Sequence, residues 1–144
     1  MKDFIYALLK VQTSYRQAFQ QKMREKGIFL TFEMFQIMSC LFDEDVLNQQ
    51  EIANKTFRDK SSLSYILKNL EKKGLISRIE DESDKRNKLI HLTDKGIAMK
   101  TEIQEILKNI YGNTLKRVEQ QEVLSCIKQL GTIEKAFKES IYEE

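Results

Sequence analysis

The stretch DKSSLSYILKNLEKKGLISRIEDESDKRNKLIHLT, residues 59–93, contains a helical pattern followed by two strand patterns. Apolar residues spaced three and four apart form one face of the helix, which we expect to end at Gly74. These apolar residues are Leu63, Ile66, Leu67 and Leu70. The opposite face holds small, polar, aromatic and basic side chains: Ser61, Ser62, Tyr65, Lys68, Asn69 and Lys72. The stretch therefore begins with an amphipathic helix whose exposed face is polar and partly basic.

The second half of the stretch predicts a β-hairpin. The runs LISRIE (75–80) and KLIHLT (88–93) partly alternate apolar and polar residues, as half-buried strands do. Between them, DESDKRNK (81–88) places six charged side chains in eight positions. Unpaired charge is too costly to remove from water, so this loop must face solvent or a charged partner.

The segment LNQQEIANK (47–55) predicts a short helix before the amphipathic one. Asn48 is a candidate N-cap, Glu51 completes a capping box, and Leu47 and Ile52 occupy the positions of a hydrophobic staple. The turn TFRD (56–59) lacks glycine, and we expect Phe57 to fill the core there. Two helices, a tight turn and a hairpin make up a winged helix-turn-helix.

Long helices are predicted on both sides of this lobe. Residues 2–26 carry an apolar stripe that stops at Gly27, and Thr31 is a candidate N-cap for an almost wholly apolar helix. Thr93 is a candidate N-cap for a helix that we expect Gly112 to break. A last helix is predicted at about 119–142.

The predicted fold class is mainly α with a small β-hairpin wing. We expect three segments: an N-terminal dimerisation helix in 1–30, a DNA-binding winged helix-turn-helix lobe in 31–96, and C-terminal dimerisation helices in 97–144. The apolar stripes of the end segments are more than one small domain can cover. They therefore favour a homodimer in which these helices bury each other.

Composition limits the classes of function. The 144 residues are 41% hydrophobic and 32% charged, and no apolar run approaches the ~20 residues that span a bilayer. The N-terminus lacks the pattern of a signal peptide, so a cytoplasmic location without membrane association is expected. One histidine, His91, and two distant cysteines, Cys40 and Cys126, do not form a zinc pattern. No catalytic group, metal or cofactor is predicted.

Charge is distributed unevenly. Residues 31–47 carry only acidic charge, whereas residues 55–73 carry six bases and two acids. Such a local basic segment indicates either an anionic partner or an ordinary solvated helix face. Both interpretations remain open on charge alone.

The segments NQQEIA (48–53) and LEKKGLISRIEDESDKRNKLIHLTDKG (70–96) together resemble the multiple-antibiotic-resistance regulator (MarR) family of winged-helix repressors. The resemblance covers nearly the whole chain. It implies a sequence-specific regulator of transcription that binds double-stranded DNA as a homodimer on a pseudo-palindromic operator and is released by a small ligand. The alternative is a winged-helix module that binds proteins and not DNA.

The resemblance also assigns roles to residues. The exposed face of the 60–73 helix would read DNA, and the wing would contribute Asp84, Lys85, Arg86 and Lys88. Arg86 is expected to enter a minor groove, with Asp84 holding it in one orientation. Tyr65 stands where related proteins often have Arg, which leaves open whether it contacts a phosphate or a thymine methyl group.

Members of this family commonly bind small aromatic acids, so such an acid is the expected effector. The residues that would line its pocket, which are also core candidates, are Met23, Phe29, Phe32, Phe35 and Met38. Cys40 is expected in the core and Cys126 beside the last apolar stripe. The peroxide-sensing branch has a cysteine on the first helix, whereas this chain has Tyr6 and Tyr15 there but no cysteine.

Overall fold

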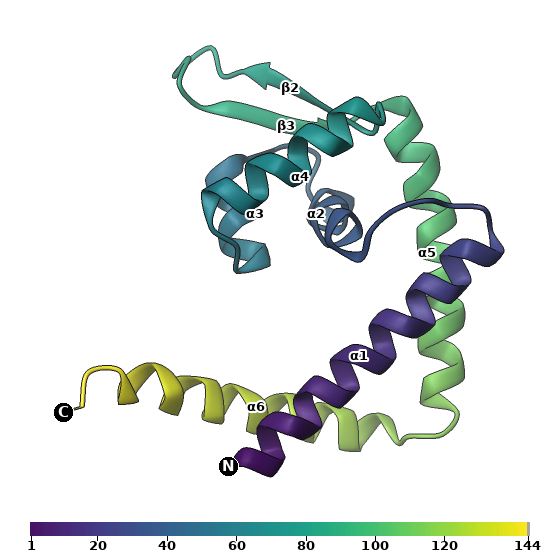
Figure 1. The fold of residues 1–144 in the computed structure, drawn as a ribbon, viewed down its shortest axis with the longest axis vertical. Helices are drawn as coiled ribbons and strands as arrows, with labels where there is room; N and C mark the ends of the chain where they lie inside the picture. Colours follow the sequence, from purple (N-terminus) through teal and green to yellow (C-terminus); the bar gives the residue numbers. More distant parts are fainter. Residues whose placement is uncertain (144) are drawn as a thin grey trace. The chain divides into compact units, whose positions relative to one another are not determined.

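The computed structural model describes residues 1–143, and Figure 1 shows the order of its elements. The helices are α1 (Lys2–Glu25), α2 (Phe32–Asp43), α3 (Gln49–Thr56), α4 (Lys60–Lys72), α5 (Asp94–Leu115) and α6 (Gln120–Ser140). The strands are β1 (Leu47–Asn48), β2 (Ile76–Glu80) and β3 (Lys88–Leu92). The chain forms two compact units that divide within α5, after Leu107, and each unit is described by itself.

The first unit contains the predicted winged helix-turn-helix. Helices α2, α3 and α4 pack around one core with the small sheet, and Figure 1 shows the β2–β3 hairpin beside α4. All four residues of the predicted α4 stripe are buried in this core, together with residues of α2, α3 and all three strands. Its members include Ile37, Met38, Leu41, Leu47, Ile52, Leu63, Ile66, Leu67, Leu70, Ile76 and Ile90.

The predicted helix starts are confirmed by their capping hydrogen bonds. Thr31 Oγ1 accepts from the Met34 N–H at 3.1 Å. Asn48 and Glu51 form the reciprocal capping box of α3, with both bonds at 2.8 Å. Each cap satisfies backbone donors that the helix itself leaves unpaired, so these starts are set by a few adjacent residues.

The sheet has one strand more than the sequence predicted. Its order is β1-β3-β2, with both pairings antiparallel. In β1, Leu47 pairs with Ile90, and Arg78 of β2 pairs with the same residue from the other side. A strand of two residues is too short to show a period in sequence, so only the pairing reveals it.

An aromatic cluster joins α1 to α2. The Phe19 and Phe35 rings stack with centroids 4.1 Å apart, and Phe32 meets Phe19 edge to face at 5.8 Å. Outside the cluster, Arg16 pairs with Glu33 at 2.7 Å. These contacts fix the C-terminal half of α1 against the winged-helix lobe, and the N-terminal half makes no comparable burial.

Three expectations from the sequence were wrong. Phe57 does not fill the core but is 94% exposed, and Arg58 takes the inward place, where its guanidinium donates to Gln36 Oε1 at 2.7 Å. Phe29, expected in the core, is 78% exposed. Gly112 does not break a helix: α5 continues to Leu115, because an isolated glycine weakens a helix without preventing one.

The second unit contains the end of α5 and helix α6. Within the described part of the chain, α6 has no buried residue, and it exposes apolar side chains along its length. They include Val123, Leu124, Ile127 and Phe137, and Ile141 at the C-cap is exposed as well. None of the helices in residues 1–143 has a stretch long and apolar enough to cross a bilayer.

Candidate nucleic-acid interface

Helix α4 begins at a tightly bonded cap. Asp59 accepts hydrogen bonds at Oδ1 from the Ser62 N–H at 2.7 Å and from the Ser61 hydroxyl at 2.8 Å. These bonds hold the pKa of the Asp59 carboxyl below its ordinary value, the Ser62 N–H contributing most. The N-terminal end of the helix is therefore fixed and carries an ionised acid.

The polar face of α4 lies in solvent, as the sequence predicted. Tyr65 is 70% exposed, and Ser61, Lys68 and Lys72 are exposed as well. Ser62 and Asn69 are half-buried at the edges of this face. The structure therefore brings the six α4 candidates onto one accessible surface.

The wing loop is braced by two of its own aspartates. Asp81 Oδ1 accepts from both the N–H and the hydroxyl of Ser83, at 3.0 and 2.6 Å, and Asp84 Oδ1 accepts from the backbone N–H of Arg86 at 3.0 Å. The Ser83 bonds lower the pKa of Asp81. Asx turns of this kind stiffen a short loop. The acids at the start of DESDKRNK thus shape the loop that presents the bases after them.

The position of Asp84 refines the expected pair with Arg86. The carboxylate contacts the Arg86 backbone, and no ion pair between the two side chains occurs in the described residues. Lys85 and Arg86 are exposed at the tip, and Lys88 is exposed at the start of β3. The loop therefore sets where Arg86 emerges, while its guanidinium extends freely into solvent.

An open groove of about 590 Å³ separates α4 from the wing. Its lining residues are Lys68 and Glu71 from α4, Ile76, Ser77 and Arg78 from β2, and Lys88 from β3. Arg78 forms an ion pair with Glu71, and the Arg78 side chain is only 19% exposed. Three bases against one acid make this groove electropositive.

Sequence reasoning missed Arg78 as a member of the site. The signal was present, because strand alternation places Arg78 on the same face as the buried Ile76. It also missed Gln49, whose side-chain amide donates to Ser64 Oγ of α4 at 2.7 Å. That bond joins the first turn of α3 to α4.

The remaining candidates differ in how far they are buried. Met23, Phe32, Phe35 and Met38 are buried in the core, while Phe29 is exposed. Cys40 is half-buried, and burial raises the pKa of its thiol; Cys126 is exposed. His91 is a half-buried residue of β3. No metal-binding group of three or more ligands occurs among residues 1–143.

Comparison with known proteins gives a consistent result. The family model described as MarR family matches residues 30–88, which contain α2, α3, α4 and β2. The transcriptional regulator SarZ of Staphylococcus haemolyticus is 32% identical over 82 residues, which span 57% of this chain and 56% of SarZ. The regulator MgrA of Staphylococcus aureus is 27% identical over 139 residues, 96% of this chain and 92% of MgrA.

Among solved structures, the DNA complex of MepR from S. aureus superposes with a TM-score of 0.80. It is 25% identical and covers 92% of this chain and 97% of MepR. The similarity to MgrA and to MepR thus extends over more than nine-tenths of the chain. Residues 30–88 form a MarR-family domain, and the chain as a whole is similar to helix-turn-helix regulators of transcription.

Proposed function

We propose that this protein is a transcriptional regulator that binds a pseudo-palindromic operator in double-stranded DNA as a homodimer. The observation that carries the proposal is the surface formed by α4 and the wing. A polar and basic helix face lies beside an electropositive groove and a braced loop with basic side chains at its tip. MepR, with the same fold, has been solved in complex with DNA.

Each part of this surface has a separate role in the proposal. Helix α4 enters the major groove, where Ser61, Ser62 and Tyr65 at its N-terminal half are the candidates for contacts with base edges. Lys68, Asn69 and Lys72, further along the helix, approach the sugar-phosphate backbone. Because Lys68 also lines the groove with Arg78 and Lys88, this groove is suited to a phosphate.

The wing reaches the neighbouring minor groove. Lys85 and Arg86 extend from the tip, and narrow A·T-rich stretches concentrate negative potential there. The hydrogen bonds that Asp81 and Asp84 accept restrict the backbone of the loop that carries Arg86. The wing loop therefore loses less conformational entropy when Arg86 binds DNA.

Dimer formation is supported by unburied apolar surface at both ends of the chain. Helix α1 exposes Ile5, Leu8, Leu9 and Val11, and α6 exposes the apolar residues named above. Several large apolar side chains left exposed on one helix indicate a protein interface. We assign 1–30 and 97–144 to dimerisation and 31–96 to DNA binding. The two-fold symmetry of the dimer would place the half-sites about one helical turn apart.

Repression, with release by a small aromatic acid, completes the proposal, and the cytoplasm is the corresponding location. The residues expected to line the effector pocket include Met23, Phe32, Phe35 and Met38, which are packed against one another or their neighbours. A ligand at that place must separate packed side chains. It would therefore favour a dimer with differently placed recognition helices.

The deciding experiment measures binding to the promoter DNA next to the protein's own gene, titrated with salt, using fluorescence anisotropy. Lys68→Ala should weaken binding to all DNA sequences alike. It should also reduce the slope of log affinity against log salt concentration by about one unit. Arg86→Ala should cost about 1–3 kcal/mol and flatten any preference for flanking A·T pairs. Folded wild-type protein that binds no duplex, neither this promoter nor any selected from random sequence, would favour the protein-binding alternative.

A further inference from the structure

Phe57, in the turn between α3 and α4, combines two unusual properties. It has the largest exposed fraction of any large apolar side chain in residues 1–143, at 94%. It is also the one non-glycine residue of that part of the chain with a positive φ, 55° with ψ 38°. A bulky side chain disfavours this left-handed conformation, and helix-turn-helix turns often use glycine. The left-handed backbone caps the C-terminus of α3, but that role does not need a large apolar side chain, so the exposed ring calls for another explanation.

The turn is held firmly on both sides of Phe57. The Phe57 N–H bonds to the Ala53 carbonyl, and the Arg58 N–H bonds to the same carbonyl at 3.1 Å. The Arg58 side chain is anchored on Gln36 of α2, and Asp59 caps α4. With Arg58 turned inward, the phenyl ring is presented to solvent from a fixed backbone.

The position of Phe57 connects it to the DNA-binding surface. It lies two residues before Asp59, so the two Cα atoms are at most about 7 Å apart. It is therefore beside the end of α4 that carries Ser61 and Ser62. Lys60, in the first turn of α4, is an exposed base that suits a polyanion, and Lys55, which pairs with Glu44 at 3.0 Å, lies on the other side of the turn.

A phenyl ring beside lysine side chains that face a polyanion gains stabilisation only by packing against an apolar group of that polyanion. In the major groove of DNA that group is the C5-methyl of thymine. We propose that Phe57 packs against a thymine methyl group at the edge of the operator half-site and thereby determines part of its sequence. This inference rests on the proposed binding of DNA.

The test uses the full-length protein and the tightest duplex that the wild type selects from a random-sequence library. Phe57→Gly suits the left-handed backbone, so its midpoint of thermal unfolding should be unchanged or higher. Its affinity for the selected duplex should nevertheless fall, on the order of tenfold. Phe57→Asn, a second residue that tolerates this conformation, should do the same, and Phe57→Tyr should retain the contact.

Replacement of each thymine by deoxyuridine, one at a time, removes single methyl groups from the duplex. At one position per half-site this replacement should weaken the wild type and leave Phe57→Gly unaffected. The inference would be overturned if Phe57→Gly bound the selected duplex as tightly as the wild type. It would also be overturned if Phe57→Gly bound more weakly but no single deoxyuridine replacement weakened binding by the wild type. Loss of binding by Lys68→Ala in the same assay would show that the DNA-binding function stands even then.

Discussion

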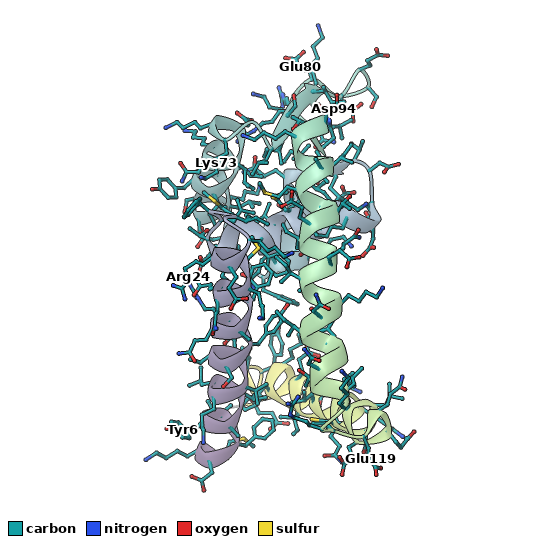
Figure 2. The ribbon with its side chains drawn as sticks, turned by 90° about the vertical axis from the view of Figure 1, so that its right-hand side faces the viewer. Tyr6, Arg24, Lys73, Glu80, Asp94 and Glu119 are labelled. Carbon is teal, nitrogen blue, oxygen red and sulfur yellow. The ribbon has the colours of Figure 1, made fainter. Side chains whose placement is uncertain are left out.

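The ammonium group of Lys95, in the first turn of α5, donates a hydrogen bond to the backbone carbonyl of Lys73 at the end of α4, at 2.7 Å. Thr93 adds a bond from its hydroxyl to the Gly74 carbonyl at 2.5 Å, and its N–H bonds to the Leu75 carbonyl at 3.1 Å. Figure 2 labels Lys73, the C-cap of α4, and Asp94, the first residue of α5. The start of α5 is thereby joined to the C-terminal end of α4.

Lys95→Ala should weaken operator binding without removing a DNA contact, because it loosens the position of α4. The dissociation constant should rise several-fold at every salt concentration, while the salt slope stays unchanged. Anisotropy titrations at three or more salt concentrations measure both quantities. Lys95→Arg, which also donates to a carbonyl, is the matched control and should restore most of the affinity. A reduced slope for Lys95→Ala would instead make Lys95 a direct phosphate contact.

Gly96→Ala should destabilise the first unit. An added Cβ would lie 2.1 Å from the Leu75 carbonyl oxygen, a backbone atom that cannot move without shifting the start of β2. Overpacking of this kind costs about 1–3 kcal/mol of unfolding free energy, measurable by urea denaturation. Gly112→Ala is the control, since nothing lies within 4 Å of its added Cβ and the helix should gain about 0.5–1 kcal/mol. Equal stabilities for the two variants would contradict the close packing of α5 against Leu75.

Substitution of Asp84 separates charge from loop geometry. Asp84→Asn keeps an oxygen that can accept from the Arg86 N–H but removes a negative charge near DNA, so affinity should be equal or higher. Asp84→Ala removes the acceptor as well, so affinity should fall. Combination with Arg86→Ala should abolish the difference between the two Asp84 variants. Tighter binding by Asp84→Ala, additive with Arg86→Ala, would mean that the hydrogen bond does not position Arg86.

Lowering the pH should reduce the free energy of unfolding, partly because the carboxylates of Asp59 and Asp81 become protonated. Both carboxyl groups have a pKa lowered from the ordinary value of 3.8, chiefly by hydrogen bonds from Ser62 and Ser83 respectively. A lowered folded-state pKa gives stabilisation that is complete above the unfolded-state value and disappears as pH falls through the folded-state value. Asp59→Asn with Asp81→Asn keeps acceptors but cannot titrate. The pH dependence of unfolding free energy below about pH 4 should therefore be shallower in the double variant.

Ile127→Glu should disrupt the dimer. Ile127 is 59% exposed on the apolar side of α6, and a charge buried in an interface is costly. Light scattering at micromolar concentration should show a shift toward monomer, with weaker operator binding. Gln129→Glu, a change of charge at an exposed polar position two residues away, should leave the dimer intact. A wild type that is itself monomeric would remove the basis for the two-fold operator.

Local features of the structure were predictable from the sequence. The caps at Thr31, Asn48 and Thr93 and the buried face of α4 depend on residues within one or two helical turns of each other. The hairpin followed from its alternation, and the charged loop from the cost of burying charge. The resemblance to the MarR family then identified the exposed face and the wing as candidates. Their contacts with DNA remain predictions.

Other features depended on residues far apart in the chain. Arg58 displaced Phe57 from the core because Gln36, 22 positions earlier, offers an acceptor for the guanidinium. Likewise, β1 forms only because Leu47 can pair with Ile90 at the edge of the hairpin. Glu71 and Arg78 form their ion pair only when the hairpin packs beside α4. The sequence by itself determined which residues form helices and which faces are apolar, since these follow from backbone bonds and short-range periodicity. Only the tertiary structure decided which side chain occupies each inward position, because that choice depends on partners that long-range packing alone brings together.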